Sequence, residues 1–183
     1  MAGTEGYLLD TNIVSAWLLP KREGHVHVVD RVASAAKTQS PLIVSSVTLG
    51  EIEYGHLAES PGGPTEVQRH FNSSIIRAFP AGPYRLPVSE HTAAYYGAVR
   101  AQVFRTYSPR DGRKARRLHQ LELPDDVECY GQRIQENDIW IASQAIERNL
   151  ILVSHDKLTV ISGCAAACGF ALRIEDWCEP MAT

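Results

Sequence analysis

The sequence predicts an α/β sandwich, in which helices cover both faces of a parallel sheet. Short apolar segments of strand length alternate with segments of helical periodicity along most of the 183 residues. The best strand candidates, LIVSS and LILVS, are continuous apolar runs, which is typical of strands that are buried on both faces. The length suits one domain, so we expect a single domain over residues 1–183.

The expected strands are bounded by turn residues or by acids. They lie at Tyr7–Asp10, Leu42–Ser45, Tyr84–Val88, Leu150–Ser154 and Ala171–Ile174. Pro41 precedes the second strand, and Pro87 places the third at an edge or a strand end, because proline cannot donate a hydrogen bond.

The expected helices lie between these strands. They span Thr11–Leu19, His25–Lys37, Thr48–Glu59, Thr65–Phe79, Ser89–Arg105 and Asn137–Arg148. Pro20 ends the first, the segment SPGGP ends the third, and the second repeats Val and Ala at helical spacing. The segment from Tyr107 to Ile134 is polar and irregular.

Composition excludes several classes of protein. An apolar fraction of 44% and a charged fraction of 21% are those of a globular chain. No apolar run approaches the roughly 20 residues that span a bilayer. The N-terminus lacks a basic segment followed by an apolar one, so we expect a cytoplasmic protein without contact to a membrane. The four cysteines form no C-x-x-C pair; for Cys164 and Cys168 we favour free thiols over a metal or redox site.

Charge is distributed unevenly along the chain. The net charge is −3, yet residues 100–117 hold seven basic residues and one acid. Such a stretch can bind phosphates, although a solvated helix end and loop is the simpler interpretation.

Four acids fall where this fold class places its ligands. Asp10, Glu51 and Asp156 follow the apolar runs YLL, LIVSS and LILVS, and Asp138 opens the helix ENDIWIASQAI. Ligands of open α/β sheets bind outside the carboxyl ends of the strands. We therefore expect these carboxylates to share one edge of the sheet.

Taken singly, each acid also has a structural explanation, although Asp10 is the hardest to explain in this way, because its strand is expected to be central and no basic residue lies nearby in sequence. Thr48 and Glu51 fit a capping box, and Asn137 fits a helix cap. Asp138 would complement the helix dipole, and Asp156 would follow Ser154 in a turn.

The set as a whole points to a metal site. Converging carboxylates repel one another and hold their protons unless a cation neutralises them. Oxygen ligands without interleaved His or Cys suit Mg²⁺ or Mn²⁺ rather than Zn²⁺. A metal held in this way activates water and stabilises charge in phosphodiester hydrolysis.

Together these segments resemble the PIN domain family, and more narrowly the VapC toxins of bacterial toxin–antitoxin modules. The resemblance rests on LLDTN, VTLGEIEYG, NDIWIASQAI, LILVSHD and IEDW, which occur in this order between Tyr7 and Trp177. It implies a three-layer sandwich with a parallel sheet of about five strands. It also implies a dimeric, Mg²⁺- or Mn²⁺-dependent endoribonuclease that cuts structured RNA of the tRNA or rRNA class and is inhibited by a cognate VapB-like antitoxin.

The resemblance also implies roles for individual residues. The catalytic acids would be Asp10, Glu51, Asp138 and Asp156, with Asp10, Asp138 and Asp156 as metal ligands. Glu51 would ligate the metal or orient the attacking water. The side chains expected to hold the carboxylates in place are Thr11, Asn12 and Ser154.

An insertion over residues 107–135 departs from the compact family pattern. It contains the candidate RNA-contacting residues Arg110, Arg113, Lys114, Arg116 and Arg117. The insertion would be an RNA-binding arm, or a segment that contacts the antitoxin or nothing.

Two other functions remain open at the level of sequence. One is a catalytically idle PIN-like module that binds RNA or protein. The other is a phosphotransferase or phosphatase with Asp10 as nucleophile, although Asn12 occupies the position where such enzymes typically carry a second acid.

Overall fold

The computed structural model describes residues 5–59, 85–107 and 134–180. Five parallel strands form one sheet in the order β3-β2-β1-β4-β5. The strands are β1 (Tyr7–Leu9), β2 (Leu42–Ser45), β3 (Arg85–Leu86), β4 (Ile151–Val153) and β5 (Arg173–Glu175). All five were expected from the sequence, and β3 lies at one edge of the sheet, as Pro87 predicts.

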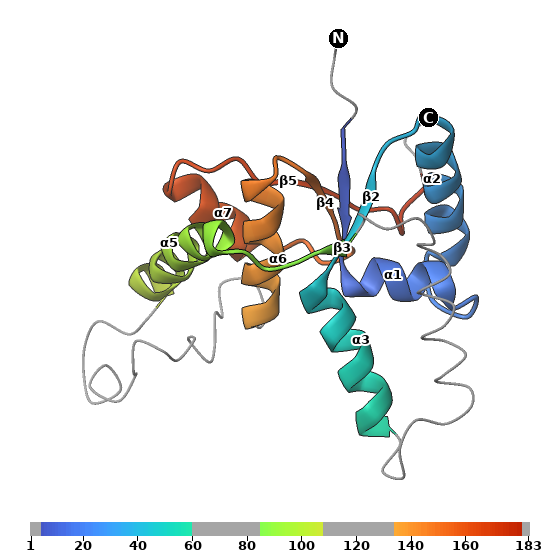
Figure 1. Ribbon diagram of the computed structural model, residues 1–183, viewed down its shortest axis with the longest axis horizontal. Coiled ribbons are helices and arrows are strands. Elements are labelled where there is room, and N and C mark those ends of the chain that lie inside the picture. The colour runs from blue at the N-terminus through green and yellow to red at the C-terminus, as the bar shows by residue number, and fades with distance from the viewer. Residues whose placement is uncertain (1–4, 60–84, 108–133, 181–183) are drawn as a thin grey trace.

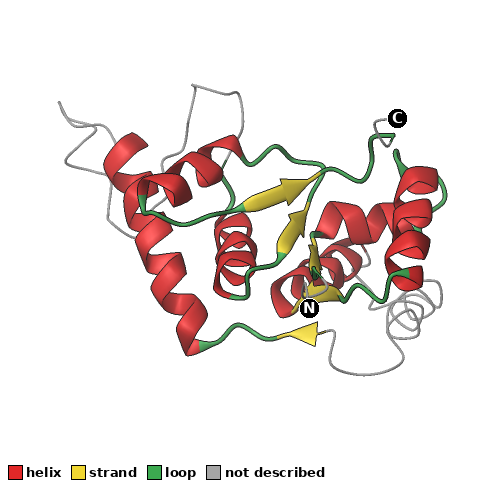
Figure 2. Ribbon diagram, turned by 90° about the horizontal axis from the view of Figure 1, so that it is seen from above, coloured by secondary structure: helices red, strands yellow, loops and turns green. Residues whose placement is uncertain are grey.

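Helices pack on both faces of this sheet, which confirms the predicted three-layer sandwich (Figures 1 and 2). On one face lie α1 (Thr11–Leu18) and α2 (His25–Lys37); on the other lie α5 (Glu90–Tyr107), α6 (Glu136–Glu147) and α7 (Thr159–Ala167). Helix α3 (Ser46–Glu59) extends from the end of β2 and contacts both α1 and α6. The expected helix at Thr65–Phe79 lies outside the described residues.

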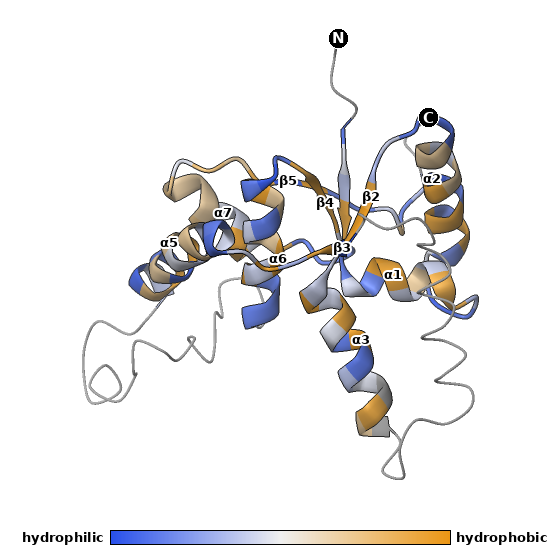
Figure 3. Cartoon of the chain, in the orientation of Figure 1, coloured by the Kyte–Doolittle hydropathy of each residue, from blue (hydrophilic) through white to orange (hydrophobic). Residues whose placement is uncertain are grey.

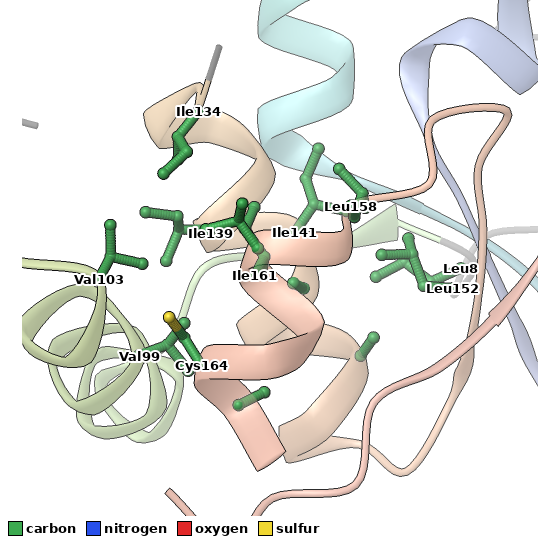
Figure 4. Close-up of a cluster of buried hydrophobic side chains, with 14 residues drawn as sticks. Leu8, Val99, Val103, Ile134, Ile139, Ile141, Leu152, Leu158, Ile161 and Cys164 are labelled. Atoms are coloured by element: carbon green, nitrogen blue, oxygen red, sulfur yellow. The ribbon is translucent and has the colours of Figure 1, made fainter. Parts of the chain in front are cut away.

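Alternation along the strands divides the core into two clusters. Leu8 of β1 and Leu152 of β4 face α5, α6 and α7, where they pack among the side chains of Figure 4. Their neighbours Leu9 and Val153 face α1 and α2. Because both faces are covered, β4 is apolar along its length, and β2 is apolar up to its last residue, Ser45 (Figure 3). Leu8, Leu9, Leu152 and Val153 are fully buried, so the two central strands contribute to both core clusters.

Strand register brings three chain segments to one edge of the sheet. Leu9 of β1 pairs with Val44 of β2 and with Val153 of β4. The residues that follow these three therefore emerge side by side at the carboxyl edge. The chain order also reverses between β1 and β4, and such a reversal is where open α/β sheets bind ligands.

None of the helices in the described ranges combines the length and the apolar character needed to cross a membrane.

Candidate active site

Asp10 is placed at this edge by the junction of β1 with α1. Its backbone N–H donates to the carbonyl of Val153, which extends the sheet by one bond of 3.0 Å. Its side chain caps α1 and accepts a hydrogen bond of 2.7 Å from the N–H of Thr11. Asp10 is only 6% exposed, so its position is fixed and its carboxylate is held away from water.

Neutral polar groups surround the Asp10 carboxylate. The hydroxyl of Ser154 donates to Oδ2 at 2.8 Å, and the amide of Asn12 lies 3.2 Å from the same oxygen. That amide also donates to Asp156 at 3.0 Å, so Asn12 links the two acids. No ion pair between described residues involves Asp10.

Glu51 lies in α3 and is held by two residues distant in sequence. The hydroxyl of Thr11 donates to Oε2, and the amide of Asn137 donates to Oε1 at 2.7 Å. The capping-box interpretation of Glu51 is wrong, because α3 begins two residues before Thr48. Instead the hydroxyl of Ser45 accepts the N–H of Val47 at the helix start, at 2.9 Å. Glu51 is thus free of a capping role and directs its carboxylate toward α1 and α6.

Asp138 lies in the first turn of α6, as the dipole argument predicted. The prediction that Asn137 caps this helix is wrong: the cap position is Gln135, without a side-chain hydrogen bond, and Asn137 holds Glu51 instead. Asp156 follows β4 in a turn, where its N–H donates to the hydroxyl of Ser154 at 3.1 Å. That turn was expected from the sequence.

The four acids interact electrostatically. Burial raises the pKa of Asp138 to about 7, and the charges of Asp10, Glu51 and Asp156 add to this shift. Burial also raises the pKa of Asp10, although the hydrogen bonds from Ser154 and Thr11 offset part of that effect. Mutual repulsion of this kind shows that the four carboxylates converge on one region, as the sequence predicted.

These acids line a cavity of about 620 Å³ at the carboxyl edge. The cavity is also lined by residues that were not predicted from the sequence as site residues: Ser15, Ala16, Arg22, Glu23, Tyr54, Gln135, His155 and Cys178. Arg22 is an exposed cation at an acidic cavity, and no local sequence signal pointed to it. His155 and Cys178 follow the carboxyl ends of β4 and β5. Their position just after predicted strands is the sequence signal that would have identified them.

The donor set fits a hard divalent cation. All four acids offer oxygen ligands, and the pKa values of Asp10 and Asp138 are raised by burial and by neighbouring carboxylates, whose charge a cation would offset. Among the described residues, no three of these acids have ligand oxygens that all lie within 4.8 Å of one another. An ion at this cavity would therefore take part of its coordination from water, as Mg²⁺ usually does.

The family model for the PIN domain matches residues 7–158 of the chain. The chain belongs to the PIN domain family. This family assignment agrees with the resemblance found in the sequence motifs. No curated protein matches the chain significantly.

Solved structures resemble this PIN domain in fold over nearly its whole length. VapBC2 from Rickettsia felis, bound to a promoter DNA fragment, has a TM-score of 0.59 and 23% identity, and the match covers 93% of this chain and 98% of that one. DNA-bound VapBC from Salmonella typhimurium has a TM-score of 0.60 and 22% identity, with coverages of 95% and 99%. VapBC-1 from nontypeable Haemophilus influenzae has a TM-score of 0.59 and 20% identity, with coverages of 94% and 98%. At these identities the likeness concerns the fold.

Proposed function

We propose that this PIN domain is a metal-dependent endoribonuclease and the toxin of a toxin–antitoxin pair. The observation that carries the proposal is the convergence of Asp10, Glu51 and Asp138: burial raises the pKa of Asp138 to about 7, and the charges of the neighbouring acids add to this shift. A purely structural cluster would gain from having its charges paired, whereas no ion pair between described residues involves Asp10.

In this proposal Asp10, Asp138 and Asp156 hold a Mg²⁺ or Mn²⁺ ion, and Glu51 ligates it or orients the attacking water. When bound, such an ion would supply an activated water and would stabilise charge on the phosphate that is cleaved. Thr11 and Asn137 hold the two oxygens of Glu51, and Asn12 and Ser154 hold the carboxylate of Asp10.

Arg22 is the residue that we propose to contact the substrate. It lines the cavity together with the acids, so it can pair with a phosphate that would otherwise be repelled by them. The basic residues Arg110, Arg113, Lys114, Arg116 and Arg117 lie outside the described residues, and their contact with RNA remains a prediction. So does the class of RNA, for which we propose structured tRNA or rRNA.

An antitoxin surface is supported by exposed apolar side chains on α2 and α3. Val26 is 65% exposed, and Tyr54 is 74% exposed and also lines the acidic cavity. A VapB-like antitoxin bound across α2 and α3 would cover these side chains and block the entrance to the cavity. Homodimer formation is a further prediction, which sedimentation of the purified chain would test.

The test of the nuclease is cleavage of total cellular RNA by the purified chain, with Mg²⁺ or Mn²⁺ and with EDTA. The wild type should give discrete fragments that require the metal. Asp10→Asn should lower the cleavage rate at least about 100-fold, because loss of a residue that only positions a metal ligand already lowers activity by up to about 100-fold, and Asp10 is proposed as a ligand itself. Asp30→Asn removes an exposed carboxylate outside the cavity and should cut normally.

Equal cleavage by the wild type and Asp10→Asn would reject the proposed site. If no RNA is cut by protein freed of any copurified partner, the idle binding module becomes the better description.

A further inference from the structure

A second cluster of metal-ligating side chains lies beside the acidic cavity. In the described part of the chain, it is the one group of three His, Cys, Asp or Glu residues whose ligand atoms all lie within 4.8 Å of one another. Its members are His155, in the turn after β4, and Asp176 and Cys178, after β5. We propose that these three side chains bind a transition-metal ion of the Zn²⁺ class, at a site separate from that of the four acids.

The two carboxylate oxygens of Asp176 have different partners within this cluster. Its Oδ1 accepts the backbone N–H of Cys178 at 2.8 Å, which fixes the plane of the carboxylate. Its Oδ2 shares a hydrogen bond of 2.9 Å with Nδ1 of His155, a contact that a bound metal ion would replace. One oxygen is therefore used to orient the carboxylate, and the other already lies against the second ligand atom.

The segment that carries these ligands is firmly held. Trp177, between Asp176 and Cys178, is 2% exposed and packs its ring against Tyr7 of β1 at 4.9 Å. Its indole N–H donates to Glu175 at 2.8 Å. On the other side, the backbone of Gly24 lies so close to Cys178 that a Cβ there would be 2.7 Å from its sulfur. The thiol is thus fixed at the wall of the cavity, which it also lines.

The donor set selects a softer metal than Mg²⁺. One imidazole nitrogen, one thiolate and one carboxylate suit Zn²⁺ and related ions, whereas Mg²⁺ binds oxygen ligands. Tetrahedral Zn²⁺ places its ligand atoms roughly 3.3–3.6 Å apart, so side-chain shifts of about 1 Å would close the site. Zn²⁺ with one thiolate, one carboxylate and a neutral imidazole has no net charge, which a half-buried position tolerates.

Water would supply the fourth ligand, as it does in open zinc sites. Glu23 lines the same cavity and its charge acts on both His155 and Cys178, but its carboxylate is not among the ligand atoms that lie within 4.8 Å of one another. The site also touches the acidic cluster, since the backbone N–H of His155 donates to Asn12 at 3.2 Å. An ion bound here would fix the loop that carries Asp156, without replacing any of the four acids.

Cobalt tests the site directly, because a Co²⁺–thiolate bond gives a charge-transfer absorption that oxygen ligands do not produce. We would titrate Co²⁺ into metal-free protein in which Cys129, Cys164 and Cys168 are replaced by Ala, so that Cys178 is the remaining thiol. One equivalent should produce the thiolate band, and Zn²⁺ should abolish it by displacing Co²⁺.

Variants then distinguish this site from the acidic cluster. Cys178→Ser in the otherwise native chain should lose the band and at least about 100-fold in Co²⁺ affinity, and Asp176→Asn should weaken binding while a thiolate remains. Asp138→Asn should keep both the band and the affinity. A folded protein with Cys178 as its one thiol that shows no band would overturn the proposal, as would a band that survives in Cys178→Ser or disappears in Asp138→Asn. These readouts need no RNA, so they stand or fall independently of the nuclease.

Discussion

Asp10 and Gln144 are both buried polar residues, but Gln144 is surrounded by neutral hydrogen-bond partners, whereas Asp10 lies among other acids. Gln144 is fully buried, and its amide donates to the carbonyls of Leu86 and Pro87 at 3.2 and 3.0 Å. Its carbonyl oxygen accepts the hydroxyl of Ser45. This network is neutral and well paired, and it ties the edge strand β3 to β2 and α6. Asp10 is nearly as buried, but it faces other acids, and its pKa is raised.

This difference indicates that the Gln144 network contributes to stability, whereas the acidic cluster is present for function. Paired neutral groups such as Gln144 and Ser45 strengthen a fold, because the hydrogen bonds offset the loss of water. Converging carboxylates weaken a metal-free fold and are retained where charge is needed for binding or chemistry. Substitutions in the two regions should therefore change stability in opposite directions.

The largest effect on stability should come from Gln144→Ala. The change leaves the Ser45 hydroxyl and two carbonyls without their partner and opens a cavity, so we expect a loss of about 3 kcal/mol in unfolding free energy. Urea unfolding measures it. Gln102→Ala, which removes only hydrogen bonds on the exposed side of α5, should change stability by less than about 0.5 kcal/mol. Equal losses in both variants would show that the Gln144 network adds nothing specific.

Gly24→Ala should have the next largest effect. Gly24 has a φ of +74°, and a Cβ would lie 2.5 Å from that of Cys178, so both strain and a clash oppose the substitution. We expect a loss of about 2 kcal/mol in thermal or urea unfolding. Gly163→Ala in α7 meets no atom within 4 Å and should be neutral or slightly stabilising. A Gly24→Ala protein as stable as the wild type would contradict the close approach to Cys178.

The smallest effect should be a pH dependence of the metal-free protein. The pKa of Asp138 is raised from 3.8 to about 7 on folding, so the folded state binds more protons than the unfolded state between these values. Stability from this group is therefore present at low pH and is lost as pH rises toward 7. Since the cavity is open to solvent, we expect on the order of 1–2 kcal/mol. Urea unfolding in EDTA at pH 5 and pH 8 should show this difference in the wild type and a smaller one in Asp138→Asn, where the raised pKa of Asp10 acts in the same direction.

The sequence was sufficient to predict the fold and the meeting of the four acids. Continuous apolar runs identify strands buried on both faces, and parallel strands bring their carboxyl ends to one edge, so Asp10 and Asp156 could be placed together. Asp138 was placed near them because it begins the helix that leads into the next strand.

The contacts that orient the acids could not be predicted in this way. A capping box and a functional glutamate share one local pattern, and the partner that distinguishes them, Thr11, lies 40 residues from Glu51. Likewise His155, Asp176 and Cys178 meet because β4 and β5 are adjacent, and each residue alone carries no signal. Specific side-chain pairing between distant segments needs the tertiary structure.

The most direct test of the central claim is thermal unfolding of the wild type and Asp138→Asn, in EDTA and in millimolar Mg²⁺. If the acidic cavity is maintained for a cation, Asp138→Asn should be more stable than the wild type in EDTA at pH 8, by about 3–6 °C in Tm. Mg²⁺ should stabilise the wild type and have little effect on the variant, because binding to the folded state alone raises its stability. A variant that is less stable in EDTA and gains as much from Mg²⁺ as the wild type would contradict the account.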